Sequence, residues 1–436
     1  MNADAATTPL AEIERRVQDR AHDRAVDPAA PDAEEMLQRF VADEIRRWND
    51  DHERGRRADP LPQPDVLAER ALRNLTGYGP LAPLLDDDDV WEIMVNAPDT
   101  IFVRRHRGPS GYHDEVFHDD AHVVRTLTKI LDDASDAHRT LDPSVGLQDA
   151  QLPDGARLHI VHGDVARGGH VMVNIRKFTG VAIRSLDELV SRDTLTDEAA
   201  AFLRAMVRSR ASVVMAGVPG SGKTTLLSCC AAELDPSLRV VVAEEVFEAD
   251  IPLPNVASMQ TRPERADRPA IDLRRLVGGF LRMAPDVAIV GEVRDREALP
   301  LLLTLSSGVK GFTTIHSGSA RQALTRLRFV SQLSDSDLPM NALNNLVTEA
   351  IDLVVHCERT PSGPQVSEII AVEELAGEAA GSAFTTTPVF VRRSPADPLE
   401  WSGVVPTRLA DAFTRVGLDL AAQLTSGAAS IEGRTR

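Results

Sequence analysis

The chain has 436 residues, a length that suggests about three domains, and 43% of them are hydrophobic, which is ample for packed cores. Its 48 Lys and Arg against 66 Asp and Glu give a formal net charge of −18, and 4% of the residues are aromatic. This acidic, aromatic-poor composition argues against a nucleic-acid-binding protein, which uses basic surfaces and stacking side chains.

The N-terminus, residues 1–5, has neither the basic segment nor the apolar segment of a secretory leader. No apolar run is long enough to cross a bilayer, so we expect no transmembrane segment. The three cysteines form no C-x-x-C pair, which argues against a zinc ribbon and a disulfide framework. The sequence therefore predicts a cytoplasmic protein, for which docking on membrane proteins stays open.

Residues 1–64 are expected to form a helical, partly flexible extension. Apolar residues recur at helical spacing within residues 34–50, and a weaker helical pattern covers residues 12–25. The apolar face of the helix at 34–50 is compatible with a small intramolecular bundle and with a docking element. Three closely spaced prolines predict a linker at the end of this region: Pro60, Pro62 and Pro64.

Residues 65–185 have the pattern of a mixed α/β domain. Asp65 is predicted to cap a helix over residues 66–75, and Gly77 is predicted to end it. The further predicted elements are strands at 91–95, 101–103 and 170–178, a helix at 123–131, and a turn at 152–157 between extended segments.

Residues 186–436 alternate strand and helix patterns, which predicts a parallel sheet with helices on both faces. The strand candidates are residues 213–216, 239–243, 287–290, 312–315 and 351–356. They are followed by a strand at 389–391, a helix near 409–424 and a small-residue tail that we expect to be mobile. The predicted fold class is α/β, with a P-loop nucleotide domain, a smaller N-terminal α/β domain and an N-terminal helical extension.

A phosphate-binding loop follows the first of these strands. The sequence fits the pattern G-x-x-x-x-G-K-S/T between a β-branched run and a helical pattern. Glycines let backbone N–H groups approach phosphates, and a helix N-terminus favours an anion. We predict that Lys223 reaches the β- and γ-phosphates of ATP and that the Thr224 hydroxyl holds Mg²⁺. The predicted nucleotide-binding residues of the loop are Gly217, Val218, Pro219, Gly220, Ser221, Gly222, Lys223, Thr224 and Thr225.

Acidic residues follow two other predicted strands. Glu292 ends the apolar run at 287–291, whereas Glu244, Glu245 and Glu248 follow the strand at 239–243. Ligands of open α/β sheets bind at the carboxyl ends of the strands, so we predict that Glu292 holds Mg²⁺ or prepares the attacking water. For the second group, a functional and a structural interpretation are both open.

Further side chains are candidates for the phosphate end of this site. His316 ends a third predicted strand, where γ-phosphate sensing or coupling and a structural role are both open. Three arginines are candidates for countering phosphate charge, although surface salt bridges are their default role: Arg294, Arg282 and Arg262.

Together these segments resemble the type II/type IV secretion ATPase superfamily, the GspE-like P-loop ATPases, over roughly residues 65–420. Within it, the chain is most similar to the CpaF-type ATPases of tight-adherence (Flp) pilus systems. The resemblance is carried by residues 77–85, 92–96, 152–157, 174–178, 244–249, 285–294 and 313–317. Three positions depart from the family pattern, since Glu245 replaces Asp, Ala249 replaces Leu and Ala284 replaces a basic residue. The absent tetracysteine motif argues against the type II secretion and type IVa pilus extension ATPases.

The resemblance implies a homohexameric ring in which ATP lies between a PAS-like N-terminal domain and a RecA-like domain. It implies that Arg157 and Arg176 match family positions whose arginines approach nucleotide phosphates. It also implies Asp-box glutamates that help at Mg²⁺ and water. The predicted catalytic residues are therefore Glu292, Lys223, Glu244, Glu248, His316 and Arg294, and the predicted metal-binding residues are Thr224, Glu292 and Glu245.

The resulting hypothesis is an Mg²⁺-dependent ATP hydrolase that powers pilus assembly or retraction through inner-membrane platform proteins. The alternative machine is a conjugative type IV secretion system. Two hypotheses belong to other classes. One is a RecA-like motor on DNA, against which the acidic composition argues, and the other is a scaffold that binds ATP without turnover.

Overall fold

The computed structural model describes residues 8–415 with internal gaps, and the chain divides into two compact units, residues 1–179 and 180–436. The gaps are residues 28–29, 31, 106–107, 134–140, 153–154, 178–182, 263–268, 335–337 and 375–383. None of the helices in the described part combines the length and the apolar character that crossing a bilayer requires.

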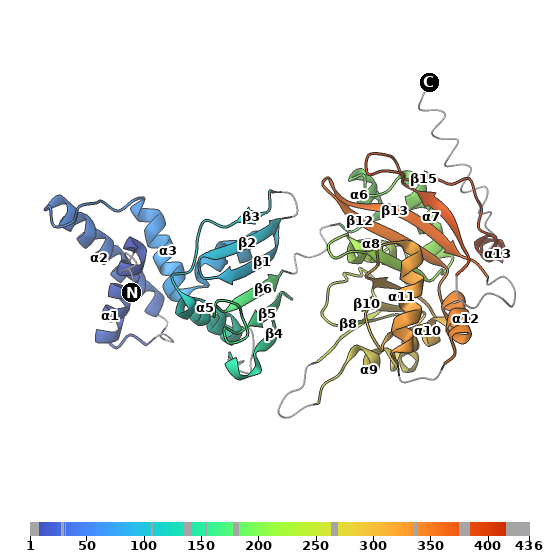
Figure 1. Cartoon of the computed structure of the whole chain (residues 1–436), viewed down its shortest axis with the longest axis horizontal. Helices are drawn as coiled ribbons and strands as arrows, with labels where there is room; N and C mark the ends of the chain where they lie inside the picture. Colours follow the sequence, from blue (N-terminus) through green and yellow to red (C-terminus); the bar gives the residue numbers. More distant parts are fainter. Residues whose placement is uncertain are drawn as a thin grey trace, which may run out of the picture. The chain divides into compact units, whose positions relative to one another are not determined.

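The first unit begins with three helices, α1 (Pro9–Asp23), α2 (Ala33–Glu53) and α3 (Pro64–Thr76) (Figure 1). Both helices predicted before residue 64 are present, and their apolar faces pack against each other in one core. Leu67 and Ala71 of α3 belong to the same core. The helical bundle therefore extends beyond the boundary expected at residue 64, and the division of this unit into two domains stays a prediction.

The predicted cap of α3 is wrong. Gln63 is the N-cap residue, Pro64 is the first helical residue, and Asp65 is the second. Proline is favoured at the first position because its φ is already helical and it lacks an N–H group that would have no partner there. The predicted end of the helix is confirmed, since Gly77 is its C-cap residue.

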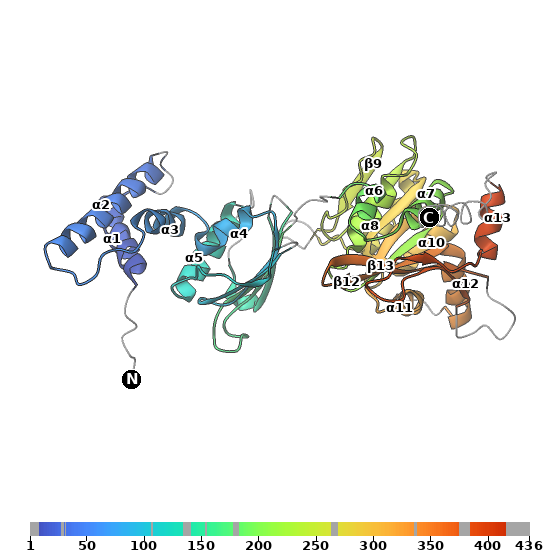
Figure 2. The same ribbon diagram turned by 90° about the horizontal axis from the view of Figure 1, so that it is seen from above.

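A six-stranded antiparallel sheet completes the first unit, with the strand order β3-β2-β1-β6-β5-β4. One face is covered by α5 (Asp120–Asp133), whose Val123, Leu127 and Ile130 lie in the core beneath the sheet (Figure 2). The other elements are η1 (Gly79–Leu81), α4 (Ala82–Asp86), β1 (Val90–Ala97), β2 (Thr100–Arg105), β3 (Gly111–Tyr112), η2 (Pro143–Val145), β4 (Leu147–Gln151), β5 (Arg157–Val161) and β6 (Met172–Arg176).

The elements predicted in this region are confirmed with shifted ends. The strand expected over residues 170–178 is shorter, as β6, and the turn expected at 152–157 connects β4 to β5. Pro153 and Asp154 of that turn, and Phe178 of that strand, lie outside the described residues.

The second unit is built on a nine-stranded sheet with the order β15-β14-β13-β12-β7-β11-β10-β8-β9. The pairs from β12 to β9 are parallel, and the pairs from β12 to β15 are antiparallel. The strands are β7 (Val213–Gly217), β8 (Val240–Glu244), β9 (Val256–Gln260), β10 (Val287–Val293), β11 (Lys310–Ile315), β12 (Leu353–Thr360), β13 (Gly363–Val372), β14 (Thr386–Val391) and β15 (Glu400–Trp401).

Helices cover both faces of this sheet (Figure 2). One core contains apolar residues of α6 (Leu186–Ser191), α7 (Asp197–Arg208) and α8 (Lys223–Ala231). The other contains residues of α9 (Leu273–Val277), η3 (Phe280–Met283), α10 (Ala298–Ser306), α11 (Ala320–Gln332) and α12 (Met340–Ala350). The architecture is the predicted α/β class with a RecA-like core.

The last predicted helix is present as α13 (Thr407–Arg415). The remainder of that helix and the tail that we expected to be mobile, residues 416–436, lie outside the described residues.

The order of the central strands positions the candidate site. β11 lies between β7, which leads into the P-loop, and β10, which carries Glu292. Because β7, β8, β10 and β11 are parallel, their carboxyl ends meet at one edge of the sheet. Four sequence segments that are far apart in the chain therefore present their polar ends at this edge.

Candidate active site at the P-loop edge

The P-loop, residues 217–225, connects β7 to α8. All five residues of β7 are buried, which fixes the start of the loop within the sheet. At Gly217 the φ angle is 148°, and a Cβ atom would lie 2.2 Å from the carbonyl oxygen of Cys357 on the neighbouring strand. Glycine is therefore required here, because any side chain would push β7 away from β12.

The end of the loop fits a phosphate group. Lys223 is the first residue of α8, and Thr224 and Thr225 follow in its first turn. The backbone N–H groups at a helix N-terminus attract anions. Ser221 Oγ is buried and has no hydrogen-bond partner within the described part of the chain. An orphaned hydroxyl beside a helix N-terminus matches the oxygens of a polyphosphate.

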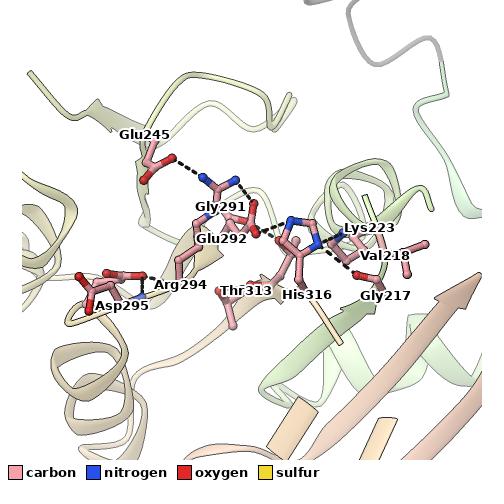
Figure 3. A network of polar contacts seen from close by, with 12 residues as sticks. Gly217, Val218, Lys223, Glu245, Gly291, Glu292, Arg294, Asp295, Thr313 and His316 are labelled. Carbon is pink, nitrogen blue, oxygen red and sulfur yellow. Dashed lines mark hydrogen bonds and ion pairs between the residues drawn. The ribbon is translucent and has the colours of Figure 1, made fainter. Parts of the chain in front are cut away.

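Lys223, His316 and Glu292 are connected by short contacts at this edge (Figure 3). Lys223 Nζ donates to the carbonyl oxygen of Val218 at 2.9 Å and lies 3.2 Å from His316 Nδ1. His316 Nε2 lies 2.7 Å from Glu292 Oε1. His316 Nδ1 also lies 3.2 Å from the carbonyl oxygen of Gly217, so a protonated Nδ1 donates to Gly217 and an unprotonated Nδ1 accepts from Lys223.

Arg294 lies between two of the predicted metal-binding carboxylates. Its Nη2 donates to Glu292 Oε2 at 2.6 Å, and its Nη1 donates to Glu245 Oε2 at 2.9 Å. The guanidinium therefore joins the end of β10 to the loop after β8 (Figure 3). Of the predicted arginines, this one is in direct contact with the predicted catalytic carboxylate.

The donor set fits an Mg²⁺ ion held mainly through phosphates and water. Within the described residues, no three His, Cys, Asp or Glu side chains are grouped so as to hold a metal. Mg²⁺ in nucleotide sites takes one or two protein oxygens and completes its shell with phosphates and water. The Thr224 hydroxyl and the Glu292 carboxylate are oxygen donors of this kind.

The contacts of Glu292 set its protonation state. Burial raises the pKa of this carboxyl group, but the hydrogen bonds from His316 and Arg294 outweigh burial and lower the pKa to about 2. The hydrogen bond to Glu292 also raises the pKa of Arg294. The carboxylate and the guanidinium therefore both stay charged at neutral pH, and Glu292 is a weak proton acceptor while both partners are in place.

Glu244 and Glu245 are neighbours in sequence but have different environments. The Glu244 side chain is 2% exposed, and its Oε1 accepts the N–H groups of Glu248 at 3.0 Å and Ala249 at 2.9 Å. A Cβ atom at Gly291 would lie 2.8 Å from Glu244 Cγ, so the glycine makes room for this side chain. Glu244 thus holds the loop that carries Glu245, whereas Glu245 is exposed and contacts Arg294.

Sequence reasoning missed Glu297. This residue is 6% exposed and immediately precedes α10. Its Oε1 accepts the N–H groups of Arg294 at 2.5 Å and of Asp295 at 2.9 Å. The available signal was an acidic residue at the start of a predicted helix, which is a common place for a carboxylate that accepts backbone N–H groups.

The remaining predicted arginines are elsewhere. Arg157 and Arg176 are register partners across β5 and β6 in the first unit, and their role at nucleotide phosphates stays a prediction. Arg282 donates to the carbonyl oxygen of Gly278 at 3.3 Å, and Arg262 donates to that of Pro269 at 3.1 Å. Arg282 and Arg262 thus each contact a carbonyl oxygen close to them in the sequence.

The chain is similar in sequence to known proteins. Residues 74–382 match the family model described as type II/IV secretion system protein. The chain is 34% identical to the conjugal transfer protein TrbB of Rhizobium radiobacter over 229 residues, which are 49% of this chain and 68% of that protein. It is 31% identical to the type IV secretion system protein PtlH of Bordetella pertussis over 309 residues, which are 64% of this chain and 88% of that protein.

A solved structure is also similar. The VirB11 ATPase from the Brucella suis type IV secretion system is 25% identical, with a TM-score of 0.35, and the match covers 66% of this chain and 94% of that one.

Proposed function

The chain belongs to the type II/IV secretion system family, and on that premise we propose that it is an Mg²⁺-dependent ATPase whose reaction takes place at the P-loop edge of its second unit. The observation that carries this proposal is the connected series Lys223, His316 and Glu292, with contacts of 3.2 and 2.7 Å, directly beside the P-loop. A phosphate-binding lysine and an ionised carboxylate at one sheet edge are the two groups that phosphoryl transfer to water requires.

Lys223 and the N-terminus of α8 bind the phosphates. Lys223 Nζ contacts the carbonyl oxygen of Val218 and His316 Nδ1. A triphosphate offers stronger, charged acceptors, so Lys223 exchanges these neutral partners for phosphate oxygens. That exchange breaks the contact between Lys223 Nζ and His316 Nδ1. The histidine is therefore coupled to nucleotide binding.

Glu292 holds the attacking water. With two cationic or polar partners its pKa is about 2, which makes it a poor base. When Arg294 turns toward the γ-phosphate, one of the hydrogen bonds that lower this pKa is lost while burial still raises it. The carboxylate becomes a better acceptor for a water proton when phosphate is present. When bound, Mg²⁺ neutralises phosphate charge, with Thr224 and Glu292 as its protein-side oxygens.

We propose the machine that this ATPase drives from the sequence motifs of the chain. The similarity to CpaF-type segments supports a homohexamer that assembles or retracts a tight-adherence pilus through inner-membrane platform proteins, at the cytoplasmic face of the membrane. A second candidate, a conjugative or related type IV secretion system, is favoured by similarity to the proteins named TrbB and PtlH. Neither machine requires this chain to bind nucleic acid directly.

An ATPase assay on the purified chain tests the reaction. We expect phosphate release that requires Mg²⁺, and Lys223→Ala should reduce it by more than about a hundredfold, since the phosphate contacts are lost. Glu292→Gln should bind a fluorescent ATP analogue with an affinity close to that of the unmodified chain and should not turn over. Hydrolysis at the unmodified rate by Glu292→Gln would show that the catalytic carboxylate is another residue.

Two further observations decide between the machines. Genes for a prepilin and for polytopic platform proteins beside this gene support the pilus, whereas relaxase and coupling-protein genes support conjugation. Deletion of the gene should abolish surface pili in the first case and DNA transfer in the second. A chain that binds ATP without Mg²⁺-dependent phosphate release would instead be a nucleotide-gated scaffold.

A further inference from the structure

Two buried glutamates have the same arrangement on the two loops that meet at the site. Glu244 accepts two backbone N–H groups on the loop after β8, and Glu297 accepts two consecutive N–H groups on the loop after β10. The two loops are joined by the contact between Arg294 and Glu245. Glu297 accepts the backbone N–H of the residue whose guanidinium contacts the catalytic carboxylate.

We infer that Glu297 is a positioning residue for the ATPase reaction, which acts by holding Arg294 against Glu292; this inference rests on the proposed function. Glu297 is almost fully buried and its Oε1 already accepts two N–H groups from its own loop, so we assign it to the loop and not to the nucleotide. The hydrogen bond from Arg294 N fixes the backbone from which the arginine side chain extends. Charged acceptors of backbone N–H groups make stronger hydrogen bonds than neutral ones.

The rest of the loop is held on its other side. Ser334 Oγ, which follows α11, donates to the carbonyl oxygen of Arg296 at 3.2 Å. Glu297 also begins α10, because its carbonyl oxygen accepts the N–H of Leu301 at 3.1 Å. The loop from Arg294 to Glu297 is thus attached at the helix and at Arg296, and the Glu297 carboxylate determines where its first residue lies. Without that carboxylate, Arg294 loses its fixed distance to Glu292 while the helix remains anchored.

Steady-state kinetics of Glu297 variants test this inference. Glu297→Ala should reduce kcat about tenfold to a hundredfold with little change in KM for ATP, because the phosphate-binding loop is untouched. Glu297→Gln keeps an oxygen acceptor and should restore kcat to within about threefold. Glu233→Ala is the matched control, since Glu233 is a half-buried carboxylate that pairs with Arg204 and Arg208 of α7. The control should leave kcat unchanged.

A double-mutant comparison separates positioning from general support of the fold. If Glu297 acts through Arg294, then Glu297→Ala added to Arg294→Ala should cause no further loss of kcat. An additional loss of the same size in the Arg294→Ala background would overturn the inference. Equal kcat for Glu297→Ala and the unmodified chain would also overturn it.

Hydrogen exchange of the peptide that contains residues 294–297 gives a readout that does not depend on ATP hydrolysis. Glu297→Ala should accelerate exchange of the Arg294 and Asp295 amides, and Glu297→Gln should not. If the unmodified chain hydrolyses no ATP, the proposed function fails, and unchanged exchange in Glu297→Ala separately overturns the geometry argued here. Faster exchange together with a lower kcat supports both.

Discussion

Two glutamate–histidine pairs in this molecule have nearly the same geometry and different surroundings. In the first unit, Glu14 of α1 contacts His118 Nε2 at 2.9 Å, and its other oxygen accepts from Asn74 of α3 at 2.7 Å. In the second unit, Glu292 contacts His316 Nε2 at 2.7 Å, and its other oxygen accepts from Arg294 at 2.6 Å. Each carboxylate therefore has a polar contact at both oxygens.

The difference lies in what each pair connects. Glu14 is 4% exposed and joins two helices of the bundle to the segment before α5, so its partners are fixed by packing. Glu292 lies beside a loop whose Lys223 contacts the carbonyl oxygen of Val218 and the His316 ring, and its own partners are a histidine and an arginine that phosphate can attract. The same pair of residue types therefore stabilises a fold in one place and is available for chemistry in the other.

The largest difference between the pairs should appear in catalysis. His316→Ala should reduce kcat by about a hundredfold, because Glu292 loses a hydrogen bond and Lys223 loses a neighbour that responds to phosphate. His118→Ala should leave kcat within about twofold. Phosphate release by the two variants under saturating ATP measures this contrast. A comparable loss of kcat in His118→Ala would mean that the first pair also takes part in turnover.

The next largest effect should be on stability. Here the first pair should matter and the second pair should not. Glu14→Ala leaves Asn74 and His118 without their buried acceptor, which should destabilise the helical bundle by about 2 kcal/mol. Hydrogen exchange of the α1 and α3 amides measures this locally, and exchange should become about thirtyfold faster. His316→Ala provides the comparison, because amide protection in α1 and α3 should then remain as in the unmodified chain.

The two regions should also respond differently to pH. His122, next to the first pair, is buried, and burial, together with the nearby charges of His118 and Arg125, lowers its pKa from 6.5 to about 4. Because folding disfavours protonated His122, the unfolded state binds more protons than the folded state between pH 6.5 and pH 4. The first unit should therefore lose up to about 3 kcal/mol of stability as the pH falls from 6.5 to 4.

Glu292 should contribute little pH dependence between pH 7 and pH 5. Its folded pKa of about 2 lies below its ordinary value of 4.5, so its stabilising contribution is fully present well above pH 4.5 and is lost progressively as the pH falls from about 4.5 to 2. Thermal unfolding at pH 7 and pH 5, followed by hydrogen exchange in each unit, checks both statements. His122→Gln removes the titrating group, and the pH dependence of the first unit should become flatter.

The smallest effect is expected at an exposed contact. Asp133 accepts from Lys129 at 3.0 Å and from the Tyr78 hydroxyl at 3.0 Å, and its side chain is 44% exposed. Asp133→Asn should change stability by no more than about 0.5 kcal/mol, because water screens an exposed ion pair. A shift in the unfolding midpoint comparable with that of Glu14→Ala would show that this contact is structurally important.

The sequence predicted those residues of the site that can be placed from the residues next to them in the chain. Lys223 follows from a contiguous motif, and Glu292 and His316 follow from the rule that strand ends meet at one edge of a parallel sheet. The α/β class followed from alternating periodicities in the same way. These features need only the residues near each strand or helix.

Contacts between distant segments were not predictable in this way. Arg294 and Glu245 are 49 residues apart, and Glu14 and His118 are 104 residues apart. Nothing in the local pattern around Glu14 distinguishes it from the other charged residues of α1, and it is buried because α3 and the segment before α5 pack over it.

The Arg294 bridge described above has a consequence for how ATP reaches the site. At this edge the positive charges of Lys223 and Arg294 are equal in number to the negative charges of Glu292 and Glu245, and the whole chain carries a net charge of −18. An anion that diffuses toward this edge therefore meets no attractive long-range field. Association with ATP should be no faster at low ionic strength than at high ionic strength, and encounter should be governed by the Mg²⁺ complex of the nucleotide, which has already lost part of its charge.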